Sequence, residues 1–234
     1  MESIKNNTNR GNIVRIVFYA MMAVDIIAVY SSYMQYRMLV SASEGMQFSE
    51  EAINGNDSRQ QLIGIIQLLL ILATIVFFIM WFHRAYKNLH RLGINTLQYT
   101  QGWAIGGWFV PFLNLVRPYT IMKEIWKNTQ EYVFTKETGI RSSAPTIIGW
   151  WWGTWLLSNV LGNASGKIAL RANSIDQMIT STQVSMFSDA VDMLSMIITL
   201  IMVTKMMDYE KQLLDYTNDP INAIKEESGL VSLQ

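Results

Sequence analysis

The sequence contains no cysteine, and this absence excludes disulfides, thiolate metal sites and cysteine nucleophiles. Histidine occurs only twice, at His83 and His90, which would lie about 10 Å apart along one helix and could not both bind one metal ion from it. The sequence also lacks a Walker loop, an HExxH motif and a Ser/His/Asp set, which argues against an ordinary ATPase or hydrolase. We therefore predict no metal ion and no cofactor.

Charged residues are also scarce, at 15% of the chain, and the formal net charge is zero. The chain therefore has no long-range field that would favour nucleic acid, and we expect no nucleic-acid partner. Half of the residues are hydrophobic, and they fall in blocks long enough to span a bilayer. This distribution predicts a membrane protein in contact with lipid.

Four apolar runs define the predicted fold, an all-α integral membrane protein with four transmembrane helices. The runs cover 13–33, 61–82, 146–162 and 184–206. Residues 1–12 form the predicted N-terminal segment, 13–206 a single transmembrane domain, and 207–234 a C-terminal tail. The tail is charged after Asp208 and is interrupted at Pro220, so we expect it to be frayed.

A fifth stretch, GWAIGGWFVPFLNLVRPY at 102–119, is apolar but contains a Gly-Gly pair and two prolines. Such a backbone survives at membrane depth only where protein or a water-filled cavity covers it. It therefore predicts a broken helical element at about 103–118, re-entrant or interfacial, with close backbone packing at Gly106 and Gly107. Asn114 and Arg117 are expected to satisfy the carbonyls that the prolines leave free. The alternative is a binding site on a discontinuous helix, as in some transporters.

Residues 119–133 have apolar side chains at helical spacing, which predicts an amphipathic helix along the membrane surface. The distribution of Lys and Arg then indicates the topology. If the broken element enters and leaves on one side, most of the 18 basic residues face the cytoplasm. If it spans the membrane, slightly more than half lie outside. The first arrangement obeys the positive-inside rule, so both termini are predicted to be cytoplasmic.

Several short motifs are similar to a known family. Phe82-x-Arg84-Ala85-x-x-Asn88-Leu89-x-x-Leu92-Gly93 precedes the central stretch, and Glu124-Ile125-Trp126 and GWWWGTWLLSN follow it. Together they resemble a family of bacterial multi-pass membrane proteins catalogued as domain of unknown function four-three-two-eight. The resemblance implies a location in the bacterial cytoplasmic (inner) membrane and supports a helical architecture. It implies no activity, substrate or catalytic residue.

Carboxylates inside the apolar runs are the strongest candidates for a binding site. Asp25 lies past the middle of the first run, without a basic residue at i±4, and Asp189 and Asp192 lie on a polar stripe of the last run. Intramembrane carboxylates are costly and normally face the bundle interior or water. We expect Asp25 and Asp192 to converge on one polar region. The alternative is a structural ion pair with Lys167 or Arg171.

Two other groups have weaker interpretations. Arg84, Asn88 and Arg91 share one helical face, which fits either contact with an anionic headgroup or simple topological anchoring. Gly149 and Gly153 form a GxxxG pair, which allows close helix packing within the chain or with a second copy or another membrane protein. The nearby tryptophans are more typical of an interfacial belt than of a cofactor site.

Three classes of function therefore stay open. We rank first a small bundle that handles ions or small solutes by permeation or transport. A scaffold or regulatory subunit that binds a partner protein comes second. A membrane-embedded enzyme acting on a lipid-like substrate, with Asp25, Asp192 or Arg117 in its chemistry, comes third.

Overall fold

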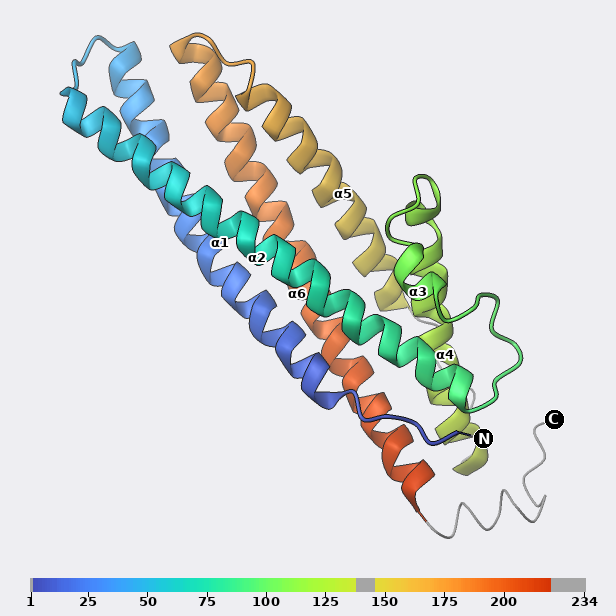
Figure 1. Cartoon of the computed structure of the whole chain (residues 1–234). Coiled ribbons are helices and arrows are strands. Elements are labelled where there is room, and N and C mark those ends of the chain that lie inside the picture. The colour runs from blue at the N-terminus through green and yellow to red at the C-terminus, as the bar shows by residue number, and fades with distance from the viewer. Residues whose placement is uncertain (1, 138–145, 220–234) are drawn as a thin grey trace. The chain divides into compact units, whose positions relative to one another are not determined.

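The computed structural model describes residues 2–137 and 146–219, and every regular element in this part of the chain is a helix (Figure 1). In chain order the elements are α1 (Thr8–Ser43), α2 (Glu50–Arg91), α3 (Trp103–Gly106), the 3-10 helix η1 (Leu113–Leu115), α4 (Arg117–Glu137), α5 (Thr146–Ala169) and α6 (Ile175–Asn218). The predicted all-α class is therefore confirmed.

Three of these helices are long and apolar enough to cross a membrane. α1, α2 and α6 have 36, 42 and 44 residues, so each exceeds the thickness of about 30 Å of a bilayer's hydrocarbon core. They contain the predicted runs 13–33, 61–82 and 184–206. The fourth run, 146–162, lies in α5, which is not among the three candidate spans. The described part of this membrane protein thus has three candidate spans, and the predicted fourth span is not confirmed.

Local sequence signals explain where the long helices begin and end. Ser49 accepts the N–H of Ala52 at the start of α2, and Ser174 accepts the N–H of Gln177 at the start of α6. α2 ends before Gly93, whose φ of 71° places it in the left-handed region that favours glycine. These caps place the hairpin turns that join α1 to α2 and α5 to α6.

The C-terminal tail differs from the prediction, because α6 continues to Asn218 instead of fraying after Asp208. Leu213 and Tyr216 are buried on this extension, and they pack in a cluster with Leu92, Tyr132 and Val133. Burial of this apolar face stabilises the added turns. The helix ends two residues before Pro220, and residues 220–234 lie outside the described part of the chain.

The central stretch is broken, as its glycines and prolines predict. α3 has only four residues, η1 has three, and Phe112 between them has a φ of 63°. The helix predicted at 119–133 forms as part of α4. Its apolar residues Ile121, Met122 and Ile125 are fully buried within the protein. This face is therefore not available to a membrane surface, and that part of the prediction is wrong.

The chain forms two compact units. The first comprises Met1–Arg15, Ile75–Trp150 and Leu200–Gln234, and the second comprises Ile16–Thr74 and Trp151–Thr199. The first unit has a core of large side chains, including Trp81, Phe82 and Tyr86, all 0% exposed. The second unit buries many polar residues instead: Asp25, Ser31, Asn56, Ser165, Ser181, Thr182, Ser188, Ser195 and Thr199. Buried polar groups need partners, so this second unit is where a site is best sought.

Candidate functional site

Asp25 lies in the apolar part of α1 and is only 2% exposed. Gln67 of α2 donates a hydrogen bond from Nε2 to Asp25 Oδ1, at a distance of 2.8 Å. The other carboxyl oxygen, Oδ2, is buried without a hydrogen-bond partner among the described residues. A buried acceptor without a partner is energetically costly. A bound proton, cation or water molecule at Oδ2 would remove that cost.

Two carboxyls of α6 lie close enough to Asp25 to interact with it electrostatically. Asp25 interacts with the charge of Asp192, and Asp189 interacts with both of the others. Ser158 of α5 donates a hydrogen bond from Oγ to Asp192 Oδ1. Like charges repel strongly in a medium of low dielectric constant. A bound proton or cation would therefore also be stabilised by the two neighbouring carboxyls.

The alternative structural ion pair is not seen. Lys167 and Arg171 are exposed, and in the described part of the chain neither forms an ion pair with Asp25, Asp189 or Asp192. The described part of the chain contains no group of three or more His, Asp or Glu side chains that could hold a metal ion. The arrangement is three separate carboxyls that influence one another, with one unpaired oxygen on Asp25.

Polar contacts continue through the second unit from these carboxyls toward the hairpin turns. Ser165 and Ser185 are hydrogen bonded across α5 and α6 at 2.9 Å. Arg59 of α2 donates from Nε to Ser31 Oγ at 2.8 Å and from Nη2 to Asn56 Oδ1 at 2.7 Å. The unit therefore contains a series of polar layers instead of a uniformly apolar interior.

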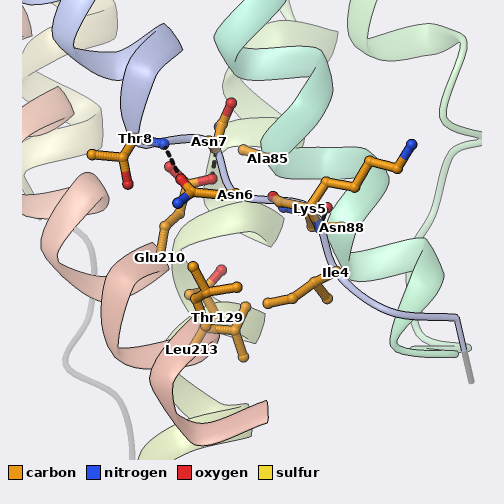
Figure 2. Close-up of a pocket in the computed structure, with 11 residues that line it drawn as sticks. Ile4, Lys5, Asn6, Asn7, Thr8, Ala85, Asn88, Thr129, Glu210 and Leu213 are labelled. Atoms are coloured by element: carbon orange, nitrogen blue, oxygen red, sulfur yellow. Dashed lines mark hydrogen bonds between the residues drawn. The ribbon is translucent and has the colours of Figure 1, made fainter. Parts of the chain in front are cut away.

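The first unit has a separate polar cluster around the N-terminal segment, shown in Figure 2. Asn7 donates from Nδ2 to Glu210 Oε1 at 2.8 Å, and the indole of Trp81 donates to Glu210 Oε2 at 3.0 Å. Burial raises the pKa of Glu210, which lies beyond the apolar run of α6, to about 7. Asn7 Oδ1 has no hydrogen-bond partner among the described residues, and the pocket beside it has a volume of about 10 Å³. That volume admits one water molecule at most, so this cluster is structural and not a ligand site.

The predicted headgroup site at Arg84, Asn88 and Arg91 contacts the N-terminal segment instead. Asn88 accepts the N–H of Lys5 at 3.0 Å and donates to the Lys5 carbonyl at 2.8 Å. Arg91 forms an ion pair with Glu2 at 3.4 Å and donates to Asn88. Two of the three side chains are thus occupied within the protein, and Arg84 alone of the set forms no hydrogen bond or ion pair with the described residues. Binding of a headgroup stays a prediction.

The central stretch is held by ring contacts. Arg117 lies 3.4 Å from the ring centroid of Trp103 and 5.2 Å from that of Tyr99. Its Nη1 has no hydrogen-bond partner, and neither Arg117 nor Asn114 donates a side-chain hydrogen bond to a carbonyl within the described residues. Within the described residues these two side chains therefore do not satisfy the freed carbonyls, and their role in binding stays a prediction. The aromatic rings stabilise the guanidinium instead.

Glu124 connects α4 to α2 and to the segment between α2 and α3. It accepts a hydrogen bond from the Tyr86 hydroxyl at 2.6 Å and from the backbone N–H of Gln98 at 2.9 Å. Burial and the adjacent Glu124 carboxylate raise the pKa of Tyr86 well above its ordinary value, so its hydroxyl stays a donor. The Glu124-Ile125-Trp126 motif thus holds α4 in place through one charged and two apolar side chains.

The motifs noted in the sequence all lie within a region that a comparison with protein families identifies. The model of the family described as Domain of unknown function (DUF4328) matches residues 44–208, which is more than half of the chain. The chain belongs to the DUF4328 family. No curated protein and no solved structure matches it. Within this DUF4328 protein the match includes Gln67, Asp189 and Asp192, whereas Asp25 precedes the matched region.

The two glycine pairs of this DUF4328 protein have different surroundings. A Cβ atom added to Gly107 would lie 2.7 Å from the Trp103 carbonyl oxygen, whereas Gly106 makes only ordinary contacts. A Cβ atom added to Gly149 or Gly153 would meet no described atom within 4 Å. Close packing is therefore present at Gly107 but not at the GxxxG pair, whose face is open in the described protein.

Two residues of the DUF4328 protein's polar clusters were not predicted. Gln67 is one of few polar residues in the run 61–82, and polarity in an otherwise apolar run is a signal that could have identified it. Glu210 was placed in a frayed tail, although Leu213 and Tyr216 continue a helical apolar pattern after it. Its partners Asn7 and Trp81 are 203 and 129 residues away in sequence, and no local pattern links them.

Proposed function

We propose that this DUF4328 protein binds a proton or a small monovalent cation at Asp25, inside the membrane, and handles ions or small solutes through this site. The observation that supports the proposal is the unpaired Oδ2 of a carboxyl that is 2% exposed. Gln67 orients Asp25, and the charges of Asp189 and Asp192 add to the attraction for a cation. Buried intramembrane carboxyls of this kind commonly mark proton or ion pathways.

The proposal includes α5 as a fourth membrane-spanning helix. Its 24 residues extend about 36 Å, which is enough to cross the hydrocarbon core. Ser158, in the middle of α5, contributes a partner to Asp192. A bundle of four spans would enclose the carboxyls with protein on more sides than three spans could.

We further propose that the broken element at 103–118 enters the membrane and returns on the same side. Large apolar side chains are exposed along it, including Phe109 at 66% and Phe112 at 83%. Exposed aromatic residues on a short loop of a membrane protein are stabilised by lipid. This arrangement follows the positive-inside rule, with both termini in the cytoplasm of a bacterium and the protein in its inner membrane.

The proposal is tested by the dependence of unfolding temperature on cations and pH for the full chain in detergent. A ligand that binds only the folded state stabilises it by an amount that grows with ligand concentration. NaCl and KCl are compared with choline chloride at equal ionic strength, at several pH values. We expect the wild-type protein to be stabilised by one of these cations or by protons, and Asp25→Asn to lose that response apart from the pH dependence that Glu210 contributes to both proteins. Asp176→Asn, a carboxyl of α6 remote from the site in sequence, is the control and should retain it. A response unchanged in Asp25→Asn would contradict the proposal.

The open GxxxG face supports a second candidate, a scaffold that binds a partner through α5. Neither Gly149 nor Gly153 is packed against described residues, whereas small residues in spanning helices favour close helix contacts. A second copy is the simplest occupant. Replacing both glycines by leucine should then shift the protein to a smaller species in light scattering of detergent complexes. An unchanged mass would remove this candidate.

A further inference from the structure

The second unit contains a cavity of about 460 Å³ where its two hairpin turns meet. We call it the hairpin cavity; its lining residues are Gln35, Met38, Leu39, Ala42, Phe48, Ile53, Asn56, Asp57, Ala169, Ala172, Met178, Ser181 and Thr182. The volume falls within the range of about 300–1,000 Å³ that small-molecule sites occupy. Such a site is mostly apolar with a few placed polar groups, and the hairpin cavity has that composition.

One side of the hairpin cavity suits an apolar body. Met38, Phe48, Ile53 and Met178 contribute large side chains, and Ile53 and Met178 stay 44% and 42% exposed. Methionine side chains adapt to irregular shapes, and their thioethers make favourable contacts with aromatic rings. The apolar lining therefore suits an alkyl or aromatic group without fixing one exact shape.

Two polar groups of the hairpin cavity, the Thr182 hydroxyl and the Asp57 carboxylate, are acceptors for a ligand. Thr182 donates its hydroxyl hydrogen to the Met178 carbonyl at 2.8 Å, so its Oγ1 can only accept from a ligand. Asn56 donates from Nδ2 to Asp57 Oδ1 at 3.2 Å, and an ionised carboxylate is an acceptor only. Asp57 is the only charged residue among the lining residues. A ligand with a positively charged donor would therefore be favoured at Asp57.

A nearby arginine, Arg59, holds the polar side of the hairpin cavity from outside its lining. Arg59 directs its Nε to Ser31 and its Nη2 to Asn56 Oδ1, and it is not among the lining residues. It holds the amide of Asn56, which in turn holds Asp57 Oδ1. Through Asn56 the arginine thus orients the Asp57 carboxylate.

We propose that the hairpin cavity binds an amphipathic ammonium compound, with its ammonium group at Asp57 and its apolar body against Met38, Phe48 and Met178. The source of this group is either a free organic amine or the ethanolamine headgroup of a lipid, since both present an ammonium joined to an apolar body. The proposal does not depend on Asp25, and it adds a ligand class that the intramembrane carboxyls do not specify.

The test uses the full chain in nanodiscs of phosphatidylglycerol and three probes that differ only in the head group. These are 4-phenylbutylammonium, 4-phenylbutanol and 4-phenylbutanoate, and binding is measured by titration calorimetry with empty nanodiscs subtracted. We expect saturable binding of the ammonium compound, at least tenfold tighter than that of the alcohol, and none of the carboxylate. Equal binding of ammonium compound and alcohol would overturn the proposal.

Variants identify the site. Asp57→Asn should weaken binding of the ammonium compound at least tenfold, while Asp176→Asn, a carboxyl at the same end of α6 outside the lining, should leave it unchanged. Ala172→Phe should also reduce binding, because it fills the apolar side of the hairpin cavity. Wild-type affinity in Asp57→Asn, with the variant correctly folded by its unfolding temperature, would overturn the proposal. Asp25→Asn should bind as wild type does, so a failure of the carboxyl site at Asp25 is distinguishable from a failure here.

The same titration in nanodiscs of phosphatidylethanolamine and of phosphatidylcholine, neither of which carries a net charge, separates the two sources. If the ethanolamine lipid occupies the hairpin cavity, the apparent affinity for 4-phenylbutylammonium is lower in phosphatidylethanolamine than in phosphatidylcholine, and this difference is absent in Asp57→Asn. If a free amine is the ligand, the affinity is the same in both lipids and still depends on Asp57. Both results support an ammonium site, whereas an affinity independent of Asp57 in both lipids contradicts it.

Discussion

Gln67 of α2 donates a hydrogen bond to Asp25 of α1, and the distance from Nε2 to Oδ1 is 2.8 Å. The contact joins two long apolar helices through their polar side chains, and it leaves Asp25 Oδ2 unpaired. Polar contacts between helices in lipid contribute modestly to stability but specify which faces meet. This pair therefore positions the carboxyl on which the proposed function depends.

Removing the amide of Gln67 should destabilise the protein, because Asp25 Oδ1 would then lose its partner. We expect Gln67→Leu to lower the free energy of unfolding by about 1–3 kcal/mol, the cost of leaving a buried acceptor unsatisfied. Unfolding in mixed micelles of detergent and dodecyl sulfate measures this change. Gln61→Leu, at an exposed position of the same helix, is the matched control. Equal effects of the two substitutions would show that the contact does not form.

The two adjacent glycines of the central stretch should respond differently to alanine. Gly107→Ala would place a Cβ atom 2.7 Å from the Trp103 carbonyl oxygen and 3.2 Å from Arg117 Cβ, so the backbone must shift. We expect a loss of about 1–3 kcal/mol, the range for overpacking. Gly106→Ala meets only Trp103 ring atoms at 3.7 Å or more and should be nearly neutral. Thermal unfolding of both variants in one detergent checks the difference, and equal losses would contradict this geometry.

Stability should fall as pH rises through the range set by Glu210. Burial raises the pKa of this carboxyl from 4.5 to about 7 in the folded protein, although its hydrogen bonds to Asn7 and Trp81 oppose the increase. The folded state therefore holds the proton more tightly than the unfolded state does. The stabilising contribution is present below about pH 4.5, is lost between about pH 4.5 and 7, and changes no further above that.

Glu210→Gln isolates this contribution, because glutamine does not titrate. The difference in unfolding temperature between wild type and Glu210→Gln should change across that pH range and be constant above it. Asp208→Asn, an exposed carboxyl two residues earlier, is the control. A difference that does not vary with pH would show that Glu210 has an ordinary pKa in the folded protein.

The sequence predicts the helical class, and three of the four predicted spans are helices long and apolar enough to cross a membrane, because the length of an apolar run is a local property. It also predicts the break at 103–118, where glycine and proline limit the helix directly. The residues against which each helix packs are distant in sequence, so a local pattern does not predict them. The periodicity of α4 predicts a helix on the membrane surface. In the structure, however, Ile121, Met122 and Ile125 are buried within the protein. Amphipathicity indicates that one face needs cover but does not distinguish lipid from protein.

The residues of the candidate site could also be predicted only in part from the sequence. Asp25, Asp189 and Asp192 are visible in the sequence because each is a charge in an apolar run. Gln67 and Ser158, which hold the carboxyls of Asp25 and Asp192, are ordinary polar residues whose roles depend on how the helices are aligned. Asn88 and Arg91 fit a headgroup site by spacing, but the N-terminal segment takes up their hydrogen bonds. Pairs of residues that are distant in sequence, such as these, can be identified only from the folded structure.

The most direct test of the central claim is ion flux through the full chain in proteoliposomes. An imposed gradient of protons, Na⁺ or K⁺ is followed with an ion-sensitive dye inside the vesicles, for wild type, Asp25→Asn and the control Asp176→Asn. We predict flux of one of these cations for wild type and for Asp176→Asn. In Asp25→Asn, inserted to the same level and equally stable, we predict that this flux is lost. Equal flux in Asp25→Asn and wild type, or no flux of any of the three cations above empty vesicles, would contradict the account.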